Sequence, residues 1–129
     1  MTSIKILIVD DDEKIIYAFR QVLEKDGHIC LEANNGTQAL ENIGTNNPDM
    51  IFMDINMPGM TGIELLKAVR ADEKLAPLPV LMVTAESKRE QIVEAAQAGV
   101  NGYIVKPFTA VTLKEKIDKI FERVEATAG

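Results

Sequence analysis

Short apolar runs alternate with helical patterns along the whole chain, and this alternation constrains the fold more than any other feature. Each run is too short for a core helix, is rich in β-branched or aromatic residues and lacks a polar alternate face. Such runs are typical of strands that are covered on both sides. We therefore predict five strands, at residues 6–9, 29–31, 50–53, 80–83 and 103–105.

The segments between these runs have the spacing of amphipathic helices. In the first segment, an apolar stripe ends before Gly27, a residue type that commonly stops a helix. Its apolar positions are Ile15, Ile16, Phe19, Val22 and Leu23. The last helix is predicted over 113–124, and the others over 37–43, 63–70 and 89–98, where Gly99 ends the segment. Five successive strand–helix pairs predict an α/β fold, with a five-stranded parallel sheet that carries helices on both faces.

Length, charge and cysteine content narrow the class of protein. At 129 residues the chain is near the commonest size of one domain, so we expect a single domain over residues 1–129. The net charge of −6 argues against a nucleic acid as direct partner. No stretch has the composition of a secretion signal or a membrane span, so we expect a cytoplasmic protein without membrane insertion. The single cysteine, Cys30, excludes an internal disulfide and is predicted to be a buried small hydrophobe.

Polar residues follow four of the predicted strands at their carboxyl ends. An acidic run begins at Asp10 after the first strand, Asp54 follows the third, Thr84 the fourth and Lys106 the fifth. Ligands of open parallel sheets bind outside these ends, where the strand order reverses. We therefore expect the four positions to share one site.

The acidic residues of this site indicate a bound cation. Asp12 and Glu13 are explained as a helix N-cap and a first-turn acid, which leaves Asp10, Asp11 and Asp54. Two carboxylates about 4 Å apart repel by roughly 4 kcal/mol at an effective dielectric near 20, so gathering three of them calls for a cation. Oxygen ligands without a histidine or cysteine partner disfavour zinc and favour magnesium, which keeps a coordination position for a phosphate oxygen.

A lysine and a hydroxyl beside these carboxylates fit a phosphorylated group. Lys106 supplies a cation, and Thr84 a hydroxyl donor, for phosphate oxygens. A metal, a lysine and a hydroxyl around one carboxylate describe a group that attacks phosphorus, as in aspartyl-phosphate chemistry. The sequence has no G-x-x-x-x-G-K-[ST] loop for ATP, and His28, its only histidine, has no acid or nucleophile nearby in sequence for a catalytic triad.

Four segments together resemble the receiver domain of two-component response regulators. They are LIVDDD at 7–12, MDINMPGMTG at 53–62, VLMVTAE at 80–86 and GYIVKPF at 102–108. The resemblance covers the whole chain and is strongest to the regulators of bacterial chemotaxis, above all from Asn56 to the final helix. It implies a flavodoxin-like sheet with strand order 2-1-3-4-5 and a receiver domain that stands alone, without an output domain.

The resemblance also implies a role for each motif residue. Asp54 is similar to the phosphoacceptor, and Lys106 and Thr84 to the lysine and the hydroxyl that contact the phosphoryl group. Tyr103 is similar to the aromatic residue that switches together with Thr84, and Lys106–Pro107 to a cis peptide of the family. The implied magnesium ligands are Asp10, partly through water, Asp11, Asp54 and the backbone carbonyl of Asn56.

These motifs imply a signalling protein rather than an enzyme. By resemblance, a histidine kinase phosphorylates Asp54 and the protein assists its own phosphorylation and dephosphorylation. The face made by the fourth helix, the fifth strand and the last helix then binds a partner. The resemblance favours chemotaxis, with a flagellar motor switch protein, or another phosphorylation-dependent target, as the partner of a monomeric regulator.

Three other functions are alternatives. A phosphorelay intermediate has the same site and passes the phosphoryl group on. A magnesium-dependent phosphohydrolase of the haloacid dehalogenase type also uses an aspartate nucleophile, but it needs an acid two residues later, where Asn56 stands, and a cap for which this chain has no spare residues. A flavin carrier needs a hydroxyl-rich phosphate loop after the first strand, where the acids at 10–13 would repel a phosphate.

Overall fold

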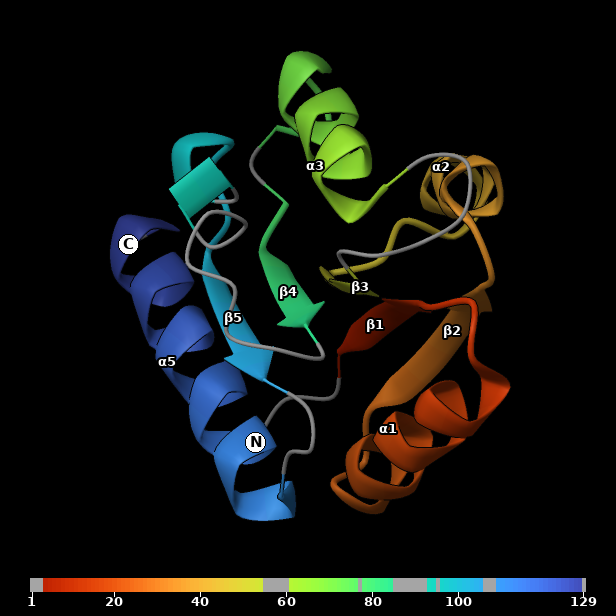
Figure 1. The fold of residues 1–129 in the computed structure, drawn as a ribbon. Coiled ribbons are helices and arrows are strands. Elements are labelled where there is room, and N and C mark those ends of the chain that lie inside the picture. Colours follow the sequence, from red (N-terminus) through yellow and green to blue (C-terminus); the bar gives the residue numbers. More distant parts are fainter. Residues whose placement is uncertain are drawn as a thin grey trace.

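Each of the five predicted apolar runs forms a strand in the computed structural model. The strands are β1 (Lys5–Val9), β2 (Ile29–Ala33), β3 (Met50–Asp54), β4 (Val80–Thr84) and β5 (Gly102–Val105). They pair in parallel in the order β2-β1-β3-β4-β5 (Figure 1). This confirms the α/β fold class and the strand order. The structure describes residues 4–54, 61–76, 78–84, 93–94, 96–105 and 109–128, and of 84, 110 and 121–128 only the backbone.

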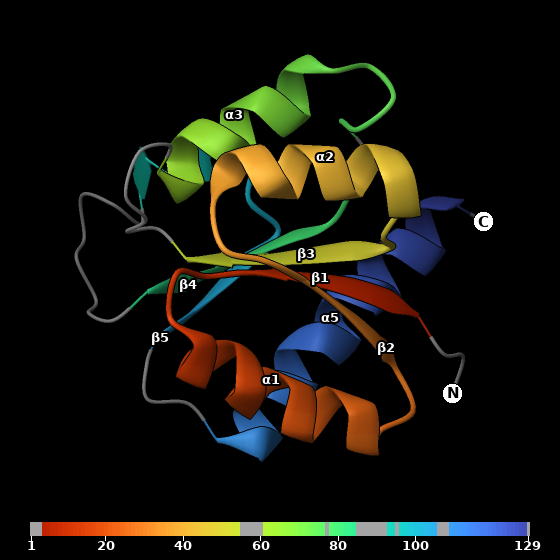
Figure 2. The same cartoon turned by 90° about the vertical axis from the view of Figure 1, so that its right-hand side faces the viewer.

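The helices cover the sheet in two layers. The described helices are α1 (Glu13–Lys25), α2 (Gly36–Asn46), α3 (Gly62–Ala71) and α5 (Ala110–Ala128). Figure 2 shows α2 and α3 on one face of the sheet and α1 and α5 on the other. Within the described ranges, no helix is both long and apolar enough to span a membrane.

Strand alternation divides the core between the two faces. Leu7 and Met53 pack with α2 and α3, whereas their neighbours Ile8 and Phe52 pack with α1 and α5. On the second face the rings of Phe52 and Phe19 meet edge to face, with centroids 5.3 Å apart. Residues of β1, β3 and β4 are therefore buried on both sides, as their apolar runs predict.

The prediction of cover on both sides is wrong for the two edge strands. Ile29 on β2 is 52% exposed, and Tyr103 on β5 is 39% exposed. Each edge strand has one neighbouring strand, so the helices above and below close over it only in part. Cys30 on β2 is accordingly half-buried rather than buried. This burial still raises the pKa of its thiol to about 11, so the thiol stays protonated at neutral pH.

The predicted helices at 37–43, 63–70 and 113–124 lie within α2, α3 and α5. Half of the prediction at 89–98 falls outside the described residues. The part that is described is helical, and the amide of Ala98 donates to the carbonyl of Glu94 at 3.0 Å. Gly99 then takes a left-handed φ of 93°, a conformation that favours glycine and ends the helix as predicted.

One local signal was missed in the sequence. Thr61 and Glu64 form a capping box at the start of α3, in which the Thr61 hydroxyl accepts from the Glu64 amide and the Glu64 carboxylate accepts from the Thr61 amide. The spacing T-x-x-E is the usual signature of this motif. The box fixes where α3 begins.

Candidate functional site

Three carboxylates converge where β1 and β3 end. Val9 pairs with Met53, and the next residue on each strand is Asp10 and Asp54. One carboxylate oxygen of each of these residues, and one of Asp11, lie within 4.8 Å of one another. Asp10 is 2% exposed and Asp54 6%, whereas Asp11 is exposed. The predicted meeting of the three acids is thus what the fold produces.

The topology of the sheet explains this position. The chain goes from β1 to the edge strand β2 and returns on the other side of β1 as β3, so the strand order reverses between β1 and β3. Open parallel sheets bind ligands outside the carboxyl ends of the strands at such a point. The acidic cluster therefore lies at the position where open parallel sheets bind ligands.

Backbone contacts fix the buried member of the acidic run. The Asp10 amide donates to the carbonyl of Ala33 at 3.1 Å, and its Oδ1 accepts from the amide of Asp12 at 2.9 Å. The first contact ties the end of β1 to β2, and the second orients the carboxylate. These bonds hold Asp10 beside Asp54 and turn the chain toward α1.

Asp12 caps α1, as the sequence predicts. It has an extended backbone, its Oδ1 accepts from the Lys14 amide at 2.9 Å, and Glu13 stands in the first helical turn. An acceptor at the N-cap satisfies an amide that has no partner within the helix, and nearby acids favour the helix dipole. The two residues therefore have structural roles and are not members of the cluster.

This cap gives a first prediction. Asp12→Ala should lower the free energy of unfolding by about 1 kcal/mol, because the Lys14 amide loses its acceptor, while Asp12→Ser should retain most of it. Both changes remove the same charge, so the two variants should bind magnesium alike. Urea unfolding and magnesium titration of the two variants check this. A loss of magnesium affinity of about tenfold or more in both variants relative to wild type would make Asp12 part of the metal site.

The remaining predicted residues are described to different extents. Asp54 pairs with Val83, and the next position on β4, Thr84, pairs with Val105 on β5. The backbone of Thr84 thus reaches the same rim as the acids. Lys106 directly follows Val105 but, like Asn56 and Pro107, lies outside the described residues. Tyr103 stands further back on β5 and is partly exposed.

The cluster fits a magnesium ion. Its donors are carboxylate oxygens, two of the three acids are buried, and the oxygens are close enough to share one cation. Hard oxygen donors suit magnesium better than zinc. His28 lies at the opposite end of the sheet, just before β2, where its Nδ1 accepts from the Ile4 amide at 3.4 Å. It is therefore not available as a ligand to the cluster.

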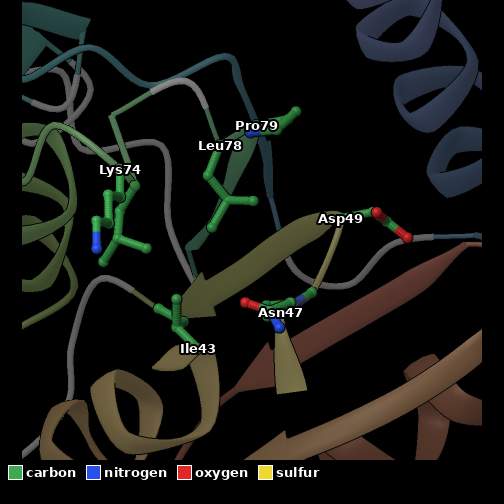
Figure 3. Close-up of a pocket in the computed structure, with 8 residues that line it drawn as sticks. Ile43, Asn47, Asp49, Lys74, Leu78 and Pro79 are labelled. Atoms are coloured by element: carbon green, nitrogen blue, oxygen red, sulfur yellow. The ribbon is translucent and has the colours of Figure 1, made fainter. Parts of the chain in front are cut away.

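A hollow of about 280 Å³ lies at the end of the sheet opposite to the acidic cluster, where β3 and β4 begin (Figure 3). It is lined by Ile43, Asn47, Pro48, Asp49, Lys74, Leu75, Leu78 and Pro79. Its single acid, Asp49, already accepts from the Lys5 amide at 2.9 Å. The hollow gathers no set of charged groups comparable to the acidic cluster, so we place the chemistry at the cluster.

The fold and the acidic rim define a class of signalling protein. Residues 6–118 match the model of the response regulator receiver domain, and the chain belongs to this family. Family membership favours a signalling role over the phosphohydrolase and the flavin carrier. Receiver domains bind magnesium at an acidic site, and the cluster found here has that composition.

Within this family the chain is CheY-like. It is 62% identical over 121 residues to the chemotaxis protein CheY of Pseudomonas aeruginosa, which covers 93% of this chain and 98% of that protein. It is 58% identical over 123 residues to the chemotaxis protein CheY-3 of Vibrio cholerae, which covers 95% of each.

Solved structures agree with this fold. The chemotaxis response regulator CheY4 of Vibrio cholerae superposes with a TM-score of 0.86 at 35% identity, over 92% of this chain and 99% of that one. A response regulator receiver domain from Francisella gives a TM-score of 0.84 at 33% identity, over 94% and 98% of the two chains. Both neighbours are receivers, like this chain.

Proposed function

We propose that this protein is a stand-alone response regulator that accepts a phosphoryl group on Asp54 from a histidine kinase. The observation that carries the proposal is the convergence of Asp10, Asp11 and Asp54 at the reversal point of the sheet. Chemotaxis is the proposed pathway, because the relatives with 62% and 58% identity are named as chemotaxis proteins. Such a role is exercised in the cytoplasm.

In the proposed reaction Asp54 is the nucleophile. One of its carboxylate oxygens forms a bond to phosphorus while the bond from phosphorus to the donor histidine nitrogen breaks, and the electron pair of that bond stays on the nitrogen. Asp54 ends a fully buried strand, so its carboxylate is held in place for attack. Asp10, Asp11, Asp54 and the Asn56 carbonyl would hold a magnesium ion, whose positive charge would offset the carboxylates and the phosphoryl oxygens.

Two further groups complete the proposed site. Thr84 ends β4, the strand next to β3, and Lys106 follows β5, the strand beyond β4. We assign to Lys106 an ion pair with one phosphoryl oxygen and to the Thr84 hydroxyl a hydrogen bond to another. Lys106 and Thr84 make these contacts only after phosphorylation, so the contacts can couple the new charge to a conformational change.

We propose residues 1–129 as a single receiver domain without an attached output domain, which signals by binding a separate partner. The coverage of 98% and 95% of the two chemotaxis relatives supports this, because each of them is little longer than the region it shares with this chain. A regulator of this kind needs a surface that changes with phosphorylation. It also needs no second copy of itself, so we propose a monomer.

The proposed output surface lies on β5, α5 and the segment before β5. A phosphoryl group adds about −1.5 to −2 charge, and Thr84 satisfies one of its oxygens by moving toward it. Space behind β4 is then free for Tyr103 to rotate inward, which gives two discrete packings. We assign to this surface Ser87, Lys88, Tyr103, Val105, Phe108, Lys116 and Lys119, of which Ser87, Lys88 and Phe108 lie outside the described residues. Its lysines suit an acidic amphipathic segment, which we propose belongs to a flagellar motor switch protein.

The coupling between site and surface gives a second prediction. A phosphoryl mimic with magnesium should raise the affinity for a partner peptide by a factor of about 5–150, the usual range of coupling between two sites. Thr84→Ala and Tyr103→Ala should lose this gain, because each removes one half of the switch. Fluorescence anisotropy of a labelled peptide measures it. Tyr17→Ala, which removes an exposed tyrosine from α1, is the control and should keep the gain. Retention of the gain in Tyr103→Ala would contradict the coupling.

A further inference from the structure

Lys116 on α5 reaches the ring of Tyr103 on β5. Its ammonium nitrogen Nζ lies 5.4 Å from the centroid of the ring. A lysine ammonium within about 6 Å of an aromatic centroid is attracted by the negative face of the ring, so the contact is a cation–π interaction. Helix and strand lie side by side at this edge of the sheet (Figure 1). The contact therefore ties the exposed tyrosine to the last helix.

The position of Lys116 around the helix axis explains this contact. Leu113, Ile117 and Ile120 are buried and mark the face of α5 that packs against the sheet. At about 100° per residue, Lys116 lies about 40° from Ile120, whereas Lys119 lies about 100° from it. Lys116 is accordingly half-buried on the flank of the packed face, and Lys119 is exposed. The flank position lets Lys116 lay its aliphatic stem along neighbouring surface while its ammonium meets the ring.

Lysines on the two flanks of α5 have different partners. Lys114 lies on the other flank and pairs with Asp26 of the α1 C-cap at 3.7 Å. Lys116 takes part in none of the ion pairs formed among the described residues. Among the described residues, the charge of Lys116 therefore interacts with the ring of Tyr103.

We infer that Lys116 is a positioning residue of the switch, which holds Tyr103 in its exposed position while Asp54 carries no phosphoryl group. The contact exists in one of the two positions of the ring and is lost when the ring turns inward. A contact made in only one of two states biases the equilibrium toward that state. The inward position of the Tyr103 ring is part of the proposed function, so this inference rests on the proposed function. Lys116 therefore opposes activation, in addition to any contact it makes with a partner.

The strength of the contact sets the size of the effect. Cation–π contacts at exposed sites are worth about 0.5–1 kcal/mol, which converts to about a twofold to fivefold change in an equilibrium constant at 25 °C. Loss of the ammonium should therefore lower the outward-to-inward ratio of Tyr103 by about twofold to fivefold. The apparent affinity for a phosphoryl mimic should rise by up to the same factor, because binding and switching are linked.

The chain provides a clean reporter for this experiment. It has two tyrosines and no tryptophan, so Tyr17→Phe leaves Tyr103 as the only tyrosine emitter. In this background we compare Lys116→Gln, Lys116→Arg and the control Lys119→Gln, which makes the same charge change three residues further along α5, at an exposed position. Acrylamide, a neutral quencher, reports the exposure of the ring without phosphodonor or metal. Beryllofluoride with magnesium is then titrated as the mimic, and melting temperatures verify folding.

The expected change in acrylamide quenching is opposite in direction to the change that loss of packing around Tyr103 would cause. Lys116→Gln should make Tyr103 less accessible to acrylamide, because more of the rings turn inward, whereas simple loss of cover would make it more accessible. Lys116→Arg should restore the wild-type value, since a guanidinium also binds the ring face, and Lys119→Gln should not depart from it. Unchanged or increased quenching in Lys116→Gln overturns the inference. If wild type fails to bind the mimic, the proposed function fails, while the quenching comparison still decides the role of Lys116.

Discussion

Asp54→Asn is expected to accept no phosphoryl group from a small phosphodonor with magnesium, while wild type gains one. The amide lacks the anionic oxygen that attacks phosphorus, so the loss should be complete rather than partial. The change keeps the size of a side chain that is 6% exposed at the end of β3, and it removes one charge from a cluster of three. The variant should therefore stay folded, and the loss can be assigned to chemistry rather than to stability.

Mass spectrometry of the intact protein measures this result, and peptide mapping after borohydride reduction of the acyl phosphate gives the modified residue. Asp118→Asn, at an exposed position of α5, is the matched control and should be phosphorylated like wild type. The site is assigned wrongly if the phosphoryl group of wild type maps to Asp10 or Asp11. It is also wrong if Asp54→Asn is modified to the same extent as wild type.

The acidic cluster was predictable from sequence because it depends on strand ends. Apolar runs mark the strands, parallel strands end at one rim, and the acids that follow them must meet there. The pattern alone does not give the order of the strands, which came from the resemblance to receivers. For the same reason it could not tell that Ile29 and Tyr103 stand on edge strands, so their exposure was missed.

Contacts between distant segments were beyond the sequence pattern. Arg70 on α3 donates to the carbonyls of Gly99, Ala76 and Leu78 at 2.6–3.0 Å. It also donates to Oδ1 of Asn101, an oxygen that accepts from the Val80 amide as well. Burial lowers the pKa of the Arg70 guanidinium, and these acceptors take the place of water around it. Such a network joins the segments that lead into β4 and β5, and no periodicity in the sequence reports it.

Asp11→Ala is expected to weaken magnesium binding by a factor of about 100 or more. Residues that only orient a metal ligand already change affinity by about 10–100-fold, and Asp11 offers an oxygen to the cluster directly. Asp11 is the exposed member of the three acids, so its removal should not disturb the core. Without metal the variant should be at least as stable as wild type, because one of three like charges is gone.

The loss of affinity should also appear in thermal stability. At a magnesium concentration of 100 times the wild-type Kd, binding to the native state adds about 2.7 kcal/mol, and a hundredfold weaker site adds about 0.4 kcal/mol at that concentration. For a domain of this size, the rise in Tm on adding magnesium should fall from roughly 10 °C to about 1–2 °C. Calorimetric titration and melting curves with and without magnesium test both numbers.

Glu13→Gln removes an acid of the first turn of α1 outside the cluster and should keep the full rise. Equal magnesium affinity in wild type and Asp11→Ala would exclude Asp11 as a ligand. If Glu13→Gln lost as much magnesium affinity as Asp11→Ala, the effect of Asp11 would be explained by net charge alone.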